Sequence, residues 1–327
     1  MDILIIGGTG NISCEVTKLL IAAEHRVTLV STGKRPVPPE CRHIKADRFD
    51  EPEFAKSLKG VGADVAIDFM AFTPDHCRAD YKALHDRIGQ FIFVSSATVY
   101  QKPHVKIPLT EDTPLGNPFW PYAQDKIACE EYLKTVHGDH FPVTVVRPSH
   151  TFGKTWIPSP INGCGFTVAE RILKGNKFII HDSGESLWTL TASSDFAKGF
   201  VGLVGNKNAF GEAFHITSDE ALTWNNIYKE LGAALGVEKL HPVHIPTEFI
   251  AGIYPEARGK LLGDKAESGV FDNSKIKKFV PAFKCEKTFA HAIRESVAWY
   301  LENPERQVID LDEDNLIDKI IDAWAAR

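Results

Sequence analysis

The chain lacks long apolar runs, a basic leader and any excess of positive charge. No stretch approaches the roughly 18 uninterrupted apolar residues of a membrane-spanning helix. The formal net charge is −6 and the isoelectric point about 6.1, so no global attraction to nucleic acid or anionic membranes is expected. The N-terminus shows no signal-peptide pattern. These absences favour a cytoplasmic protein whose partners are neither nucleic acid nor membrane.

Paired cysteines are missing as well. The chain has six cysteines and no Cys-x-x-Cys pair; they are Cys14, Cys41, Cys77, Cys129, Cys164 and Cys285. Scattered cysteines of this kind are typical of buried thiols in a reducing compartment. The sequence therefore predicts neither a metal site nor a disulfide framework.

A glycine-rich turn near the N-terminus is the first positive signal. The apolar run Ile3–Ile6 ends in Gly7-Gly8-Thr9-Gly10-Asn11-Ile12-Ser13, and a second apolar run follows at 25–30. Strand, glycine turn, helix and strand over about 30 residues is typical of a dinucleotide-binding unit, because the glycines let the backbone approach a pyrophosphate. A tight turn without ligand is the alternative. Ser13 stands where the last glycine of the pattern is expected, and its small size should preserve the close packing.

The end of the second strand bears on the choice of cofactor. An acidic residue there would bind the adenosine ribose and repel a 2′-phosphate. This chain has Ser31, Thr32, Lys34 and Arg35 instead, whose hydroxyls and charges suit a 2′-phosphate. We therefore expect NAD(P) binding with NADP favoured over NAD. The alternative is a basic surface turn.

Four further expected strands, alternating with helical patterns, predict a Rossmann-type, doubly wound parallel sheet over residues 1–150. These strands are expected at 43–48, 64–69, 90–95 and 143–148. Asp47, at a strand end, is expected to accept a hydrogen bond from adenine or to cap a helix. Phe69, Met70 and Ala71 should line the cofactor site. Residues 151–327 predict a smaller mixed α/β substrate lobe, interleaved with the sheet near 190–220, with helices near 167–173, 193–204, 223–235 and 287–302.

Tyr122 and Lys126 are four residues apart in a segment with no helix breaker after Pro121. On a helix, that spacing places both side chains on one face. An ammonium near a phenol favours the phenolate and lowers the tyrosine pKa. The pair is therefore an acid–base candidate, although a lone Tyr-x-x-x-Lys is more often part of an ordinary amphipathic helix.

Taken together and in this order, these motifs resemble an extended short-chain dehydrogenase/reductase, of the NAD-dependent epimerase/dehydratase family. The resemblance adds Ser95-Ser96-x-x-Val99-Tyr100 and Arg147-Pro148, and it runs over nearly the whole chain. It implies that Tyr122 is the acid–base, that Lys126 binds the nicotinamide ribose, and that Ser96 bonds the reacting oxygen. The cofactor residues that it implies, with those from the pattern, are Gly7, Thr9, Gly10, Asn11, Ile12, Ser31, Thr32, Lys34, Arg35, Asp47, Arg48, Phe69, Met70, Ala71, Ser95, Tyr122, Lys126 and Pro148. A homodimer is also implied.

Departures from the family pattern bear on the substrate, for which Ser96, Thr98, His150 and Trp188 are candidates. Ala97 and Thr98 replace the acidic pair of sugar-nucleotide dehydratases, so dehydration is disfavoured. Trp188 stands where epimerases of this family carry an arginine that clamps a diphosphate, and an indole cannot form that ion pair. No spacing selects a replacement among Lys154, Arg171, Lys177 and Arg258.

The resemblance predicts hydride transfer, as an epimerase or a reductase, on a sugar or nucleotide-linked sugar. Chloroplast stem-loop-binding proteins of the same broad group also resemble this chain and bind RNA. The alternative function is therefore a dinucleotide-sensing or RNA-binding protein with weak catalysis.

Overall fold

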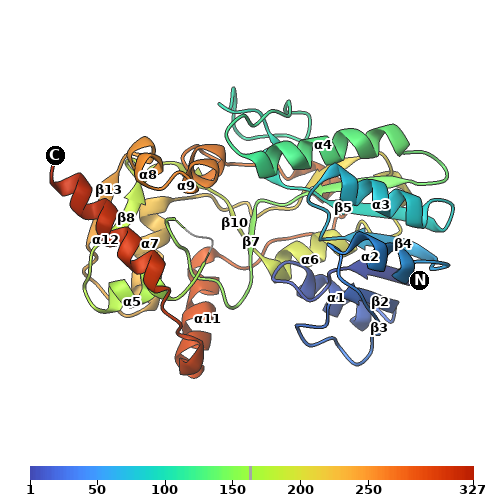
Figure 1. Ribbon diagram of the computed structural model, residues 1–327, viewed down its shortest axis with the longest axis horizontal. Helices are drawn as coiled ribbons and strands as arrows, with labels where there is room; N and C mark the ends of the chain where they lie inside the picture. The colour runs from blue at the N-terminus through green and yellow to red at the C-terminus, as the bar shows by residue number, and fades with distance from the viewer. Residues whose placement is uncertain (162–163) are drawn as a thin grey trace.

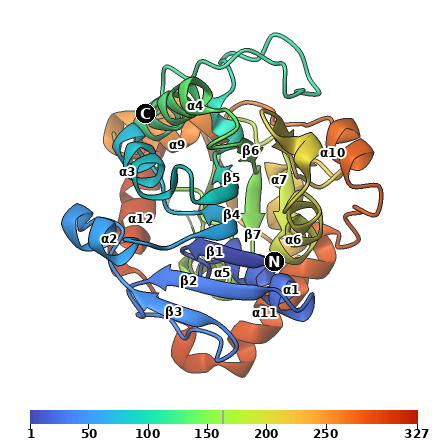
Figure 2. The same ribbon diagram turned by 90° about the vertical axis from the view of Figure 1, so that its right-hand side faces the viewer.

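One sheet forms the centre of the larger lobe (Figures 1 and 2). Its strands are β1 (Asp2–Ile6), β2 (Arg26–Ser31), β3 (Arg42–Lys45), β4 (Ala63–Asp68), β5 (Ile88–Val94), β6 (Val143–Arg147) and β11 (Ala213–His215). In this computed structural model, which describes residues 1–161 and 164–327, the order is β11-β6-β5-β4-β1-β2-β3 and all neighbours are parallel. The predicted doubly wound α/β sheet is confirmed.

Both faces of the sheet are buried, because successive side chains of a strand point to opposite sides. In β1, Ile3 and Ile5 belong to one apolar cluster and Leu4 and Ile6 to another. Two helices cover the first face: α1 (Ser13–Ala22) and α6 (Ser193–Val201). Three cover the second: α2 (Glu51–Ser57), α3 (Pro74–Leu84) and α4 (Pro121–Val136).

The strand order reverses between β1 and β4. From β1 the chain winds outward through β2 to β3, then crosses back to β4 and winds the other way through β5 and β6. At such a reversal the loops after neighbouring strands diverge and leave a crevice at the carboxyl edge of the sheet. The glycine turn after β1 and the segment that follows β4 both lie at this crevice.

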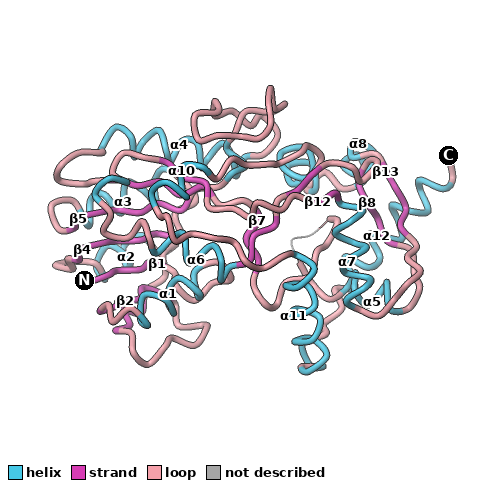
Figure 3. Tube along the Cα trace, turned by 180° about the vertical axis from the view of Figure 1, so that it is seen from behind, coloured by secondary structure: helices cyan, strands magenta, loops and turns pink. Residues whose placement is uncertain are grey.

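The C-terminal lobe has its own apolar core, which packs helices around a parallel strand pair. Figure 3 shows it beside the carboxyl edge of the sheet. Its elements are α5 (Thr167–Leu173), β8 (Phe178–His181), α7 (Trp224–Ala234), β13 (Pro242–Ile245), α8 (Thr247–Ile253), α9 (Ala257–Lys260), a π-helical turn (Leu261–Lys265), α11 (Phe289–Glu302) and α12 (Leu311–Ala325). Four of the predicted helices correspond to α5, α6, α7 and α11.

Short strand pairs join the two lobes. They are β7 (His150–Phe152) with β10 (Leu190–Ala192), and β9 (Leu187–Trp188) with β12 (Leu222–Thr223). After β10 the chain returns to the sheet as α6 and β11, and α10 (Ser274–Phe279) packs beside β11. Within the described residues, no helix is long and apolar enough to cross a membrane.

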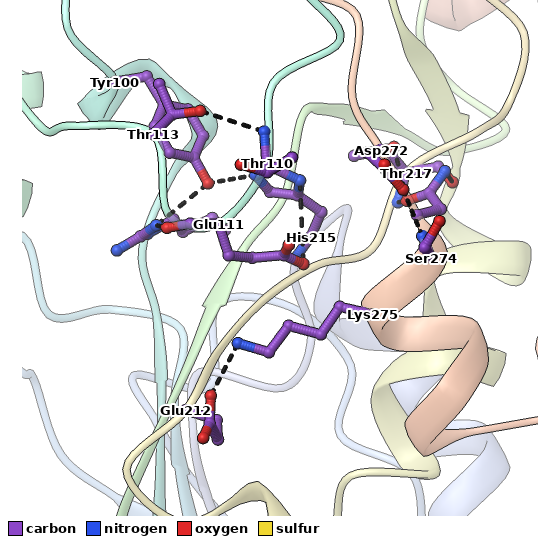
Figure 4. A network of polar contacts seen from close by, with 12 residues as sticks. Tyr100, Thr110, Glu111, Thr113, Glu212, His215, Thr217, Asp272, Ser274 and Lys275 are labelled. Carbon is purple, nitrogen blue, oxygen red and sulfur yellow. Dashed lines mark hydrogen bonds and ion pairs between the residues drawn. The ribbon is translucent and has the colours of Figure 1, made fainter.

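A buried polar network fixes the edge formed by β6 and β11 (Figure 4). Arg147, at the end of β6, pairs with Glu130 of α4 at 2.6 Å and donates to the Tyr100 hydroxyl at 3.1 Å. The same hydroxyl contacts the ring of His215. The backbone N–H of His215 donates to the Glu111 carboxylate at 2.9 Å. One arginine thus joins the sheet, α4 and the segment after β5.

We predict that Glu130→Gln destabilises the protein strongly, because the Arg147 and Glu130 side chains are each only 7% exposed. Removing one partner of a buried ion pair leaves an uncompensated charge and costs about 3–5 kcal/mol. Glu248→Gln, which breaks the exposed Arg258–Glu248 pair, should cost less than about 1 kcal/mol. Urea unfolding of both variants measures the difference. If both substitutions lowered the free energy of unfolding by the same amount, the stabilising role of the Arg147–Glu130 pair would be contradicted.

Candidate active site

A cavity of about 770 Å³ opens at the carboxyl edge of the sheet and is lined from both lobes. With one exception, every residue predicted for cofactor or substrate lies along it. On the cofactor side these are Gly7, Thr9, Gly10, Asn11, Ile12, Ser31, Thr32, Lys34, Arg35, Asp47, Arg48, Phe69, Met70, Ser95, Tyr122, Lys126 and Pro148, and on the substrate side Ser96, Thr98, His150 and Trp188. Ala71 is the exception: it is fully buried beneath Lys126.

The glycine turn forms one end of the cavity. Gly7 has φ +101°, and a Cβ there would lie 3.1 Å from Met70 Cγ and 3.3 Å from Phe69 Cβ. Only glycine therefore lets the backbone run this close to the segment after β4. Ser13 is buried at the start of α1 and accepts a hydrogen bond from the Gly10 N–H at 2.9 Å. The turn thus keeps a backbone cradle of the kind that a dinucleotide pyrophosphate needs.

The basic segment after β2, residues 31–35, lines the same end of the cavity. Arg35 donates to the Thr9 carbonyl at 3.1 Å and so bridges to the glycine turn. Ser31 Oγ lies 3.0 Å from the ring of His43, a neighbour that sequence reasoning missed. Asp47 accepts from the Phe49 N–H at 2.9 Å and does not cap α2.

The cap of α2 is Asp50, which accepts from the Glu53 N–H. The capping alternative for Asp47 was therefore wrong.

Arg48, predicted to bind cofactor, already has other partners. Its guanidinium lies 2.8 Å from Asp80 and 3.3 Å from Asp68. Burial and the neighbouring Asp68 raise the pKa of Asp80. Arg48 therefore lines the cavity mainly as a member of a buried charge cluster.

Lys126 is buried below the middle of the cavity, with 1% of its surface exposed. Its ammonium donates to the Ala71 carbonyl at 2.6 Å and the Val94 carbonyl at 2.8 Å. It also lies 4.8 Å from the ring centroid of Phe93. Burial lowers its pKa, because desolvation disfavours the charged form. The ammonium thus ties α4 to the ends of two adjacent strands.

Tyr122 lies one helical turn before Lys126 and faces the cavity. Burial raises its pKa to about 12, partly offset by a hydrogen bond with Ser96. The sequence predicted the opposite direction, from the charge of Lys126. That ammonium is directed at two carbonyls and lies 5.8 Å from the Tyr122 ring centroid, so desolvation dominates in this structure. Ser96 Oγ accepts from the Thr98 N–H and hydroxyl, at 3.2 and 2.9 Å.

His150 and Trp188 lie at the far end of the cavity. The His150 ring is 4.5 Å from the Trp188 ring and 4.7 Å from Trp156, and its Nε2 has no hydrogen-bond partner in the described part of the chain. Burial lowers its pKa to about 3, with a smaller contribution from Lys265. The ring is therefore neutral at physiological pH.

Several lining residues had no sequence signal. Trp120, Lys102, His104, Asp264 and Phe271 all line the substrate end. The last two come from segments about 140 residues beyond α4, and only the fold brings them there. Of these five residues, only Trp120 stands beside a predicted site residue in the sequence, directly before Pro121-Tyr122.

The four cations considered as diphosphate clamps do not line the cavity. Arg171 pairs with Asp314 and Asp318, and Arg258 pairs with Glu248. Lys154 and Lys177 are exposed elsewhere. In the described chain, no group of three or more metal-ligating side chains gathers, and all six cysteines are free thiols.

The fold is that of an extended short-chain dehydrogenase/reductase. The model of the NAD dependent epimerase/dehydratase family matches residues 3–216, and the chain belongs to that family. It is therefore an NAD(P)-dependent enzyme of this class, and its reaction is considered below.

Named relatives differ in what they do. The 2′-dehydrokanamycin reductase of Streptomyces kanamyceticus is 24% identical over 311 residues, which cover 92% of this chain and 85% of that protein. The chloroplast stem-loop binding protein of 41 kDa b of Arabidopsis thaliana is 28% identical over 267 residues, covering 76% and 68%. The structure of UDP-glucose 4-epimerase from Bifidobacterium longum with NAD⁺ and UDP has a TM-score of 0.74 at 19% identity, covering 94% and 100%. That likeness shows the fold.

We predict that His150 makes the protein less stable in acid. Its pKa is about 3 in the folded state and about 6.5 in an unfolded chain. Between these values only the unfolded state takes up the proton, so stability is full above about pH 6.5 and falls by about 1.4 kcal/mol per pH unit below it. His150→Phe keeps an aromatic ring and should reduce the slope of unfolding free energy against pH by about that amount between pH 4 and 6. An unchanged slope would contradict the assignment.

Proposed function

We propose that the protein is an NADP-dependent reductase of a keto group on a sugar, with Tyr122 as its proton donor. The observation that carries the proposal is the convergence of Tyr122, Ser96 and Lys126 on one cavity that continues to the glycine turn. When bound there, a reduced nicotinamide supplies the hydride. Cytoplasmic localisation and a homodimer remain part of the proposal.

The surroundings of Tyr122 suit a proton donor. Burial raises the pKa of the phenol to about 12, so the phenol stays protonated at neutral pH, as a general acid must before it gives its proton to the oxygen of a reduced carbonyl. Ser96 Oγ accepts two hydrogen bonds from Thr98 and is hydrogen-bonded to Tyr122, so we assign Ser96 to holding the phenol beside the substrate oxygen. One relative that matches 92% of this chain is named a reductase.

The basic segment supports NADP over NAD. Lys34 and Arg35 line the cavity, and Arg35 is anchored to Thr9 beside the glycine turn. Two cations and the hydroxyls of Ser31 and Thr32 provide charge and donors for a 2′-phosphate. Residues 31–35, directly at the end of β2, contain no carboxylate that would favour a free ribose hydroxyl.

The relative named as a stem-loop-binding protein favours a second candidate, a dinucleotide-sensing or RNA-binding protein with weak catalysis. The net charge of −6 and the assembled Tyr122, Ser96 and Lys126 speak against it. This candidate predicts tight binding of NADPH or of a stem-loop RNA, with no turnover of any keto sugar. That result would favour the second candidate function over the reductase.

Tyr122→Phe should lower kcat/KM for keto-sugar reduction by about 10²–10⁴-fold, because positioned general acids contribute factors of that size. The assay follows NADPH absorbance with a panel of keto sugars. Tyr132→Phe, on the same helix but outside the cavity lining, is the matched control and should keep wild-type activity. If Tyr122→Phe reduced keto sugars at the wild-type rate, the proposed mechanism would be contradicted.

Replacing Lys34 and Arg35 together with alanine should weaken NADPH binding by about tenfold or more while leaving NADH binding nearly unchanged, since charge-assisted phosphate contacts are the strong ones. Titration of each cofactor by calorimetry measures both. Lys45→Ala, an exposed lysine near this region that does not line the cavity, controls for general charge. Equal affinity of the wild type for both cofactors would overturn the preference.

A further inference from the structure

The substrate end of the cavity presents one carboxylate between two indoles. Trp188 Nε1 donates to Asp264 Oδ1 at 3.3 Å. On the other side, Trp120 lies with its ring 4.9 Å from that of Tyr122. Asp264 is close enough to the phenol that its charge contributes to the raised pKa of Tyr122. The carboxylate and the proposed proton donor therefore face the same space.

The fold holds Asp264 there through close backbone packing. Asp264 belongs to the π-helical turn Leu261–Lys265, a form of helix that is rare and often marks functional sites. A Cβ on Gly259 would lie 2.5 Å from the Trp120 ring, and one on Gly263 would lie 2.8 Å from Trp120 Cβ. Trp120 thus packs directly on the backbone of this segment and fixes Asp264 opposite Tyr122.

Few cations balance this carboxylate. Lys102 lies 3.4 Å from Glu267 and is paired with it. The buried Lys265 ammonium donates to the Ser159 carbonyl at 3.0 Å and lies 5.3 Å from the Trp224 ring. Asp264 has no ion pair within 4 Å among residues 1–161 and 164–327, although both lysines act on it at longer range and burial raises its pKa.

Arginines are also absent from the substrate end as the structure describes it. Those that line the cavity are Arg35, beside the glycine turn, and Arg48, which pairs with Asp68 and Asp80. A diphosphate here would meet the Trp188 ring and the Asp264 charge. It would lack the planar guanidinium that binds phosphate well.

We propose that the substrate is a sugar that bears an ammonium group and no diphosphate, and that Asp264 binds this ammonium. Trp120 then provides an aromatic surface for the sugar ring and cation–π attraction for its charge, while Trp188, stacked on Trp224, holds the Asp264 carboxylate through its N–H. The inference rests on the proposed function, because it places the sugar beside Tyr122. It adds the substrate class and the residue that selects it.

Calorimetric titration of the NADP⁺-loaded protein tests this without turnover. The ligands are kanamycin as an aminoglycoside probe, the same compound N-acetylated as a neutral match, and UDP-glucose. We expect kanamycin to bind at least about tenfold more tightly than the other two, because a desolvated charge pair is lost in each of them. Tighter binding of UDP-glucose, or equal binding of the acetylated compound, would overturn the proposal.

Asp264→Asn should abolish that preference and leave NADP⁺ binding unchanged, which also reports correct folding. Glu256→Gln is the matched control, because Glu256 is an exposed carboxylate at the start of α9 outside the cavity lining. Kanamycin affinity that survives Asp264→Asn would contradict the role of Asp264. Failure of the proposed reaction would appear separately, as an absence of NADPH oxidation with the binding preference intact.

Discussion

The buried ammonium of Lys126 is the constraint on which the site depends. Its bonds to the Ala71 and Val94 carbonyls satisfy backbone groups that the sheet leaves open at the ends of β4 and β5. An unpaired buried charge would cost several kcal/mol, so α4 is held in one position relative to the strand ends. That position sets Tyr122 over Ser96. The backbone carbonyls of Ala71 and Val94 thus help to decide where Tyr122 lies.

The opposite wall of the cavity depends on packing between distant segments. Gly259 and Gly263 lack side chains, and Trp120 occupies the space. Larger residues at either glycine would push the indole toward Tyr122 and shift Asp264. Tyr122 and Lys126 are therefore fixed within the sheet lobe, while the wall that holds Trp120 and Asp264 is fixed by packing between segments that are far apart in the sequence.

The sequence was most informative where one local rule applied. Apolar runs predicted five of the seven strands of the central sheet, because a parallel strand buried on both faces needs continuous apolar residues. The edge strand β3 was also predicted, although three of its four residues are polar and exposed. The short β11 had no such signal as a strand of this sheet, since its place is set by β6. Asp264 was missed because nothing near it in the sequence marks a cavity. The direction of the Tyr122 pKa was missed because burial is a property of the fold.

The chain passes to the C-terminal lobe and back to the sheet, which limits how the lobes can be exchanged between related proteins. After β10 the chain returns to supply α6 and β11, so the sheet is completed by residues from beyond the first crossing. A cut after residue 150 would leave β6 as an open edge and uncover the face that α6 protects. The C-terminal lobe therefore cannot be exchanged as a single cassette. We therefore expect new specificities in this architecture to arise by substitution and loop exchange within one chain rather than by exchange of whole lobes.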